Sequence, residues 1–183
     1  MSISKPVRQE EMLPPFEKIG EENWSQKLRK LLNSFDIPLP APVSSAEIQE
    51  REQALALTFP VPLKTFLLEF GPISFDYVEL LPPSQISRAT ELWFADKLDE
   101  NPVDYLIVAN AGGPDNQFVI ELKNGHCLLA RHDSAKLESC VTCFDDLIRI
   151  SCIGLYTGYY GWDDLELVEM QSKLMQELFG VIL

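Results

Sequence analysis

Residues 44–71, SSAEIQEREQALALTFPVPLKTFLLEFG, decide the fold more than any other stretch of this chain, because they predict two short helices joined by a corner. Ser44 followed by Glu47 forms a capping box, in which each side chain satisfies a backbone N–H group at the start of a helix. Ile48 and Leu55 lie seven residues apart and share one face of that helix. No residue in the segment is suited to catalysis, so it identifies a scaffold and not a reaction.

A proline-marked corner separates the two predicted helices. Phe59-Pro60 ends the first helix, since a residue before proline is pushed out of the α conformation. Pro62 suits the first turn of the second helix, where no backbone N–H is needed, and Gly71 suits its C-cap. The apolar face of the second helix follows the i, i+3, i+4, i+7 pattern: Leu63, Phe66, Leu67 and Phe70.

This order of features resembles the start of the SUKH superfamily, the group around a fungal regulator of cell-wall glucan synthesis. The matching elements of the opening are Glu47-Ile48, Leu55, Phe59-Pro60, Phe66-Leu67 and Gly71. Further matches follow in the family's order: Glu79-Leu80-Leu81-Pro82, Tyr105 to Ala109, Gly112-Gly113, Phe118-Val119-Ile120, His132-Asp133 and Phe144-Asp145-Asp146-Leu147. The resemblance covers residues 44–150. Many bacterial members are immunity proteins that neutralise polymorphic toxins, and the resemblance implies such a role here.

Length and composition independently predict a globular protein. The chain has 183 residues, of which 46% are hydrophobic, enough for one domain with extensions and too many for general disorder. No apolar run approaches the roughly 20 residues that span a bilayer, and residues 1–15 lack the apolar core of a secretory signal. Four unevenly spaced cysteines do not suggest a secreted disulfide framework. We therefore expect a cytoplasmic protein with reduced thiols.

The negative charge is concentrated away from the N-terminus. The net charge is −13, with 0 in residues 1–43, −9 in residues 44–150 and −4 in residues 151–183. Such a field repels nucleic acid and anionic lipid and steers basic proteins toward the surface. The alternative is that the acidity only keeps the protein in solution. We expect a basic protein partner, no nucleic acid and no membrane.

Residues 1–43 predict an N-terminal extension with one helix and a proline-rich linker. Residues 1–20 contain three prolines and no periodicity, so we expect them to be mobile or loosely attached. A helix is predicted over residues 21–35 by the shared face of Trp24, Leu28, Leu31, Leu32 and Phe35. The linker over residues 37–42 favours an extended connection. The helix either packs back onto the main domain, which we favour, or docks a partner.

The main domain, residues 44–150, combines helices with a strand meander. A third helix is predicted over residues 86–97. Three antiparallel strands follow at residues 104–109, 117–122 and 127–132, with Asn124-Gly125 as the strongest hairpin signal. A further helix carries Phe144, Leu147, Ile148 and Ser151, with Thr142 as its N-cap. The fold class is α+β, with helices packed on a mostly antiparallel sheet and helical extensions at both ends.

Residues 151–183 predict an aromatic loop and a last helix that packs on the domain. Residues 155–164, LYTGYYGWDD, place three tyrosines and a tryptophan between glycines. Such aromatics serve either as core residues, which we favour, or as interface hot spots. The last helix has an apolar face made of Leu167, Met170, Leu174, Leu178 and Phe179. That face covers either the sheet or a second copy in a homodimer.

Catalytic and metal-binding signals are weak. Cys140 and Cys143 form a CxxC pair with Cys127 and His132 nearby, but a zinc site would need a second pair at suitable spacing. His132-Asp133 suggests a general base with Cys127 or Ser134 as nucleophile, yet no third, orienting group is evident. We expect no cofactor and no bound metal.

The function that these observations predict is a non-catalytic protein-binding module. By resemblance, the leading hypothesis is an immunity protein that blocks a basic, nuclease-like toxin. A second hypothesis is a regulatory scaffold or self-associating protein like the fungal namesake, and a third is a hydrolase that uses His132 and Asp133. The predicted contact residues combine acidic and aromatic side chains: Asp76, Glu79, Asp115, Tyr159, Tyr160, Trp162, Asp163 and Asp164.

Overall fold

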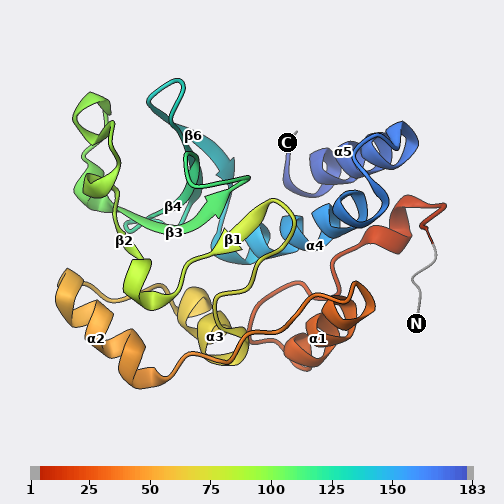
Figure 1. Cartoon of the computed structure of the whole chain (residues 1–183), viewed down its shortest axis with the longest axis horizontal. Coiled ribbons are helices and arrows are strands. Elements are labelled where there is room, and N and C mark those ends of the chain that lie inside the picture. Colours follow the sequence, from red (N-terminus) through yellow and green to blue (C-terminus); the bar gives the residue numbers. More distant parts are fainter. Residues whose placement is uncertain (1–4, 181–183) are drawn as a thin grey trace.

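An antiparallel sheet and five α-helices make up residues 5–180, the part of the chain that the computed structural model describes (Figure 1). The strands are β1 (Val78–Leu80), β2 (Ser87–Arg88), β3 (Tyr105–Ala111), β4 (Gln117–Glu121), β5 (Cys127–Arg131) and β6 (Lys136–Val141). The sheet order is β1-β3-β4-β5-β6, and β2 also pairs with β3. The helices are α1 (Trp24–Ser34), α2 (Ser45–Leu55), α3 (Val61–Phe70), α4 (Phe144–Tyr160) and α5 (Leu165–Phe179). The predicted α+β class is confirmed.

The predicted strand meander is confirmed as β3, β4 and β5. The hairpin between β4 and β5 turns at Asn124 and Gly125, where Gly125 has a φ of 81° that favours glycine. The Asn124 side chain accepts the backbone N–H of His126 at 2.9 Å. The edge strand β6 was not predicted, because residues such as Glu138 and Ser139 are exposed and leave it without an apolar pattern.

The two helices predicted from residues 44–71 are present as α2 and α3. Both bonds of the capping box form: Glu47 N–H donates to Ser44 Oγ at 3.2 Å, and Ser44 N–H donates to Glu47 Oε2 at 2.9 Å. The four residues of the apolar face of α3 are all buried. The first helix ends sooner than predicted, at Leu55, because Ala56 adopts a left-handed conformation (φ 50°).

The segment before α1 is packed onto the domain, which corrects the expectation of a loosely attached region; residues 1–4 lie outside the described part. Met12, Phe16 and Ile19 are buried. A short 3-10 turn, η1 (Gln9–Met12), lies beside α4 and α5, and the Tyr156 hydroxyl donates to the carbonyl of Glu11 at 2.8 Å. No periodic pattern predicts this packing, because single apolar residues at irregular spacing are buried one by one.

The third helix predicted over residues 86–97 is wrong. Ser87 and Arg88 form β2 opposite Ile107 and Leu106 of β3. Four 3-10 turns surround and follow this strand: η2 (Pro83–Gln85), η3 (Ala89–Glu91), η4 (Ala95–Lys97) and η5 (Pro102–Asp104). Pairing with a strand distant in sequence outweighs the local helical spacing of the apolar residues.

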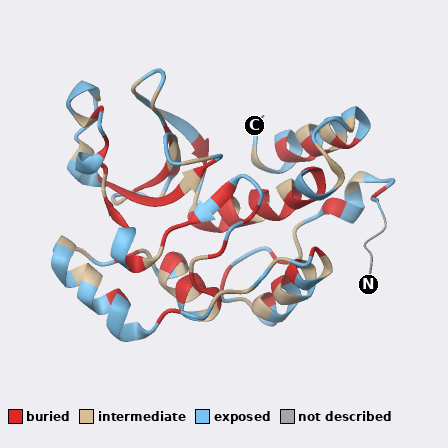
Figure 2. Ribbon diagram, viewed as in Figure 1, coloured by how far each residue is buried: buried red, intermediate tan, exposed pale blue. Residues whose placement is uncertain are grey.

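The aromatic loop predicted over residues 155–164 is largely helix instead. α4 continues without interruption to Tyr160, and most of its surface is buried (Figure 2). Gly158 does not break the helix; a Cβ there would lie 2.5 Å from Cγ of Asp76, so the position demands a residue without a side chain. The helix begins one residue later than predicted, with Cys143 as N-cap, and the Thr142 hydroxyl donates to Asp146.

The last helix, α5, packs against α4. Leu167, Leu174 and Met175 are buried, and the Thr157 hydroxyl of α4 donates to the Gln171 side chain of α5 at 2.7 Å. Figure 1 shows α5 running alongside α4, next to the N-terminal segment. Among residues 5–180, no helix is long and apolar enough to cross a membrane.

Candidate protein-binding site

Asp76 and Trp162 meet although they come from distant parts of the chain. Asp76 lies in the turn before β1, and Trp162 lies in the turn between α4 and α5. The indole Nε1–H of Trp162 donates to Asp76 Oδ2 at 3.1 Å, and the residue is 54% exposed. With Tyr159 and Asp163 they form an exposed set of acidic and aromatic side chains, which we term the acidic-aromatic corner.

Glycine at the end of α4 brings the corner together. Gly158 lets the Asp76 carboxylate lie against the helix. Gly161 then ends the helix at a φ of 112°, and its N–H donates to the carbonyl of Thr157 at 2.8 Å. Trp162 and Asp163 follow in the turn, and both are exposed.

Asp164 serves the fold as well as the surface. Its carboxylate accepts the N–H of Leu167 at 3.3 Å and so caps α5. Lys5 forms an ion pair with it at 2.5 Å, and the hydrogen bond from Lys5 lowers the pKa of the Asp164 carboxyl. Of the two neighbouring acids, Asp163 is the more exposed one, and Asp164 is the one that caps α5.

The two adjacent tyrosines at the end of α4 differ in exposure. Tyr159 is 46% exposed, and its ring packs edge-on against Phe35 with 5.5 Å between ring centroids. Tyr160 is half-buried, packs against the hydrophobic core, and contacts the Tyr159 ring at 5.1 Å. Burial raises the pKa of the Tyr160 hydroxyl. Tyr159 thus presents its ring to the outside, whereas Tyr160 supports it from behind.

The remaining two predicted residues lie on the strand side of the corner. Glu79 is exposed on β1, and its carboxylate accepts the Asn110 side chain at 3.1 Å. Asp115 is exposed on the loop between β3 and β4. The first glycine of that loop, Gly112, donates its N–H to the carbonyl of Tyr77 at 2.7 Å. This bond holds the loop beside the residue that follows Asp76.

Two grooves flank the Asp76–Trp162 hydrogen bond. The first, which we term the linker groove, has a volume of about 580 Å³ and runs between the proline-rich residues 37–40 and the end of α4, with Asp76 in its lining. The second, the sheet groove, has a volume of about 460 Å³ and lies between β5, β6 and the two last helices, with Trp162 in its lining. The corner is the ridge between them, an arrangement that the sequence did not indicate.

His132 and Asp133 serve the turn between β5 and β6. The His132 ring nitrogen Nδ1 lies 3.2 Å from Asn116 Oδ1, and that oxygen also accepts the His132 backbone N–H at 3.1 Å. Asp133 accepts the backbone N–H of Ser134 at 2.8 Å. The contacts with Asn116 tie this turn to the loop between β3 and β4, and Asp133 bonds to the backbone and not to the His132 ring, so the pair is not arranged as a base with its orienting acid.

Three of the four cysteines, Cys127, Cys140 and Cys152, are buried as free thiols. Burial raises the pKa of Cys140 to about 11 and that of Cys127 well above its ordinary value, which disfavours the reactive thiolate. Cys143 is partly exposed, and its Sγ donates to Asp146 Oδ2 at 3.4 Å. Within the described residues 5–180, no group of three or more His, Cys, Asp or Glu side chains is arranged to hold a metal ion.

Comparison with known proteins identifies a family for the central part of the chain. Residues 42–150 match the SMI1/KNR4 family (SUKH-1), a span that runs from the end of the linker to the middle of α4. A search of curated proteins finds no match. The family match takes in 109 of the 183 residues and confirms the resemblance that begins at the capping box of Ser44 and Glu47. The chain therefore belongs to the SMI1/KNR4 (SUKH-1) family.

Proposed function

We propose that this protein is an immunity-type binding protein of the cytoplasm that neutralises a basic, nuclease-like toxin by covering its cationic surface. The observation that carries the proposal is the exposed Asp76–Trp162 pair on the ridge between two grooves. Membership of the SUKH-1 family and a net charge of −13 support it. The role requires no catalytic group, only a preformed surface.

The corner has the physical properties of a binding hot spot. Tryptophan and tyrosine bury a large area on binding and lose little rotamer entropy, and a long-range negative field speeds encounter with a cationic partner. The bond to Asp76 fixes the Trp162 indole before binding, which lowers the entropy cost further. A partner lysine or arginine placed beside Asp76 or Asp163 would gain a charge-assisted hydrogen bond.

The corner lies only partly within the family match. The family match ends at Ile150, inside α4, so it includes Asp76 but not Tyr159, Trp162 or Asp163. The scaffold thus contributes one acid, and the C-terminal extension contributes the aromatic residues. We propose that the extension sets which toxin is bound.

The test is affinity capture from the native host with matched tryptophan variants. Trp162→Ala removes the centre of the corner, while Trp93→Ala removes a tryptophan that is 64% exposed on the η3–η4 region. We expect the wild type and Trp93→Ala to retain the same basic protein at low salt and release it at high salt. Trp162→Ala should lose it, and co-expression of the wild type should rescue growth against that protein.

Two outcomes would overturn the proposal. Equal capture by Trp162→Ala would remove the corner from the interface. Recovery of only the protein itself, or of acidic enzymes held equally at high salt, would favour the scaffold or self-association role of the family's fungal namesake. Circular dichroism of both variants establishes that each retains the fold.

A further inference from the structure

The linker groove combines apolar walls with a single charge. Residues 37–40, Phe75 and Leu155 contribute apolar surface to its lining. Among the described residues that line it, Asp76 is the only charged one, and it lies beside Tyr159. An apolar groove with one carboxylate suits a side chain that is apolar along its length and carries one positive charge at its end.

The carboxylate and the ring are held in place for such a cation. Trp162 uses one of the roughly four acceptor positions of the Asp76 carboxylate and fixes its orientation. Phe35 packs against Tyr159 at 5.5 Å and 75°, which supports the ring from one side. Pro38 and Pro40 have no backbone N–H, so these two wall positions present no donor that would compete with a cation.

The same fold already binds an arginine in this manner elsewhere. Arg29 lies over the Phe70 ring, with 4.7 Å from its Cζ to the ring centroid. Its guanidinium donates to the Glu69 carboxylate at 2.9 Å and to the Glu69 carbonyl at 2.7 Å. Within this protein, an aromatic ring and a carboxylate together already hold an arginine side chain.

We propose that the linker groove is the anchor site for one arginine side chain of the partner, with its guanidinium on Asp76 and its stem along the proline-rich wall. Arginine fits better than lysine, because a planar guanidinium both stacks on Tyr159 and bonds a carboxylate with two parallel donors. The anchor deepens, and rests on, the proposed binding of a basic protein. With the anchor in the linker groove, the partner segment that carries this arginine would lie over residues 37–40 as well as over the corner.

The test uses Nα-acetyl-arginine-N-methylamide as probe, and the indole N–H signals of the three tryptophans as reporters in a ¹H–¹⁵N NMR titration. Trp24 is buried and Trp93 is exposed elsewhere, so both serve as internal controls for Trp162. We expect a saturable shift of the Trp162 signal alone. The uncharged citrulline analogue, which has nearly the same shape, should produce no such shift, and the lysine analogue should bind several-fold more weakly.

Matched variants separate the anchor from general charge effects. Asp76→Asn keeps an acceptor for Trp162 and should weaken arginine binding at least tenfold. Asp99→Asn removes an equal charge from an exposed position after η4, outside the candidate site, and should leave arginine binding unchanged. An unchanged Trp162 signal, or equal shifts with citrulline, would overturn the anchor. If the anchor fails in this way but Trp162→Ala still abolishes capture of the basic protein, the proposed function survives. If the arginine probe binds but Trp162→Ala captures the basic protein as well as the wild type does, the proposed function fails alone.

Discussion

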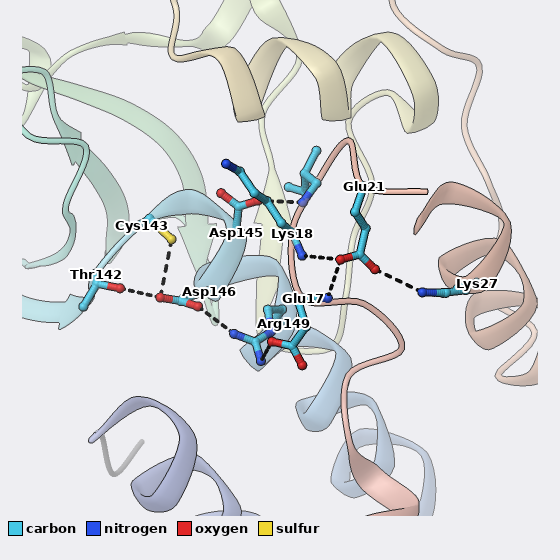
Figure 3. A network of polar contacts seen from close by, with 10 residues as sticks. Glu17, Lys18, Glu21, Lys27, Thr142, Cys143, Asp145, Asp146 and Arg149 are labelled. Atoms are coloured by element: carbon cyan, nitrogen blue, oxygen red, sulfur yellow. Dashed lines mark hydrogen bonds and ion pairs between the residues drawn. The ribbon is translucent and has the colours of Figure 1, made fainter. Parts of the chain in front are cut away.

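The carboxylate of Asp145, at the start of α4, accepts the backbone N–H of Ile19 at 2.6 Å in the interior of the protein. A second contact lies close by: Arg149 pairs with Glu17 at 2.8 Å and with Asp146 at 3.0 Å (Figure 3). These interactions join the N-terminal segment to the first turn of a helix more than a hundred residues later. The extension before the family match is therefore part of the folded unit.

Replacing Asp145 by alanine should destabilise the protein, because the N–H of Ile19 would stay buried without an acceptor. An unsatisfied buried donor costs about 1–3 kcal/mol, and we expect the free energy of unfolding in urea to fall by that amount. Asp115→Ala, on an exposed loop, is the matched control and should change it by less than about 0.5 kcal/mol. Equal stability of the two variants would contradict the role given to Asp145.

Phe16→Ala tests whether the N-terminal segment contributes to the core. Phe16 is 2% exposed and packs edge-on against Trp24 at 5.9 Å, and removal of a buried phenylalanine costs about 3–5 kcal/mol. Its neighbour Leu13 is 47% exposed, so Leu13→Ala should have little effect. The measurement is urea unfolding followed by tryptophan fluorescence. A small effect of Phe16→Ala would restore the expectation of a loosely attached segment.

What could be predicted from the sequence is the part of the fold that neighbouring residues specify. The capping box of Ser44, the apolar face of α3 and the Asn124-Gly125 hairpin are local features, and all three are present. The helix predicted over residues 86–97 fails because β2 pairs with β3, a contact between distant segments. The position of Gly158 in a helix depends likewise on Asp76, which no local pattern reveals.

The candidate site follows the same division. Acidic and aromatic residue types were enough to select Asp76 and Trp162, but their hydrogen bond and the two grooves beside them depend on tertiary structure. The sequence did not show that Asp164 rather than Asp163 accepts the N–H of Leu167, or that Tyr160 packs against the Tyr159 ring. Residue chemistry therefore selected the candidate residues, whereas only the fold shows which of them are exposed and which hold the surface in place.

Asp163 and Asp164 should separate binding from stability. Asp164→Ala removes the N-cap of α5 and the ion pair with Lys5, and loss of a cap costs about 1 kcal/mol. Asp163→Ala removes an exposed charge and should leave the free energy of unfolding unchanged, while it lowers the association rate with the captured basic partner. Thermal unfolding and surface plasmon resonance at two salt concentrations measure the two effects. A lower stability of Asp163→Ala would contradict this assignment.

The buried thiol of Cys140 should make stability fall at high pH. Burial raises its pKa to about 11 in the folded protein, whereas the unfolded thiol ionises near its ordinary value of about 8.5. Folding therefore holds the proton more tightly, so this contribution is complete below about pH 8.5 and is lost as the pH rises toward 11. Between pH 8 and pH 10 the loss is about 1–2 kcal/mol. Urea unfolding of Cys140→Ala should show a shallower decline than the wild type, and parallel declines would contradict it.

Two glycines of α4 provide the sharpest comparison within one helix. A Cβ at Gly154 would meet nothing within 4 Å, so Gly154→Ala should stabilise the helix by up to about 1 kcal/mol through its higher helix propensity. Gly158→Ala gains the same propensity but places its Cβ 2.5 Å from Cγ of Asp76, which forces that carboxylate away from Trp162.

We therefore expect Gly158→Ala to lose the stability gain, to shift the Trp162 indole signal in NMR, and to weaken capture of the basic partner. Gly154→Ala should keep both the signal and the capture. If Gly158→Ala instead matches Gly154→Ala in stability and indole signal, the turn before β1 moves without loss of stability. The fixed orientation of Asp76 would then not be what prepares the corner for binding. The comparison thus separates a preformed binding surface from one that forms only with its partner.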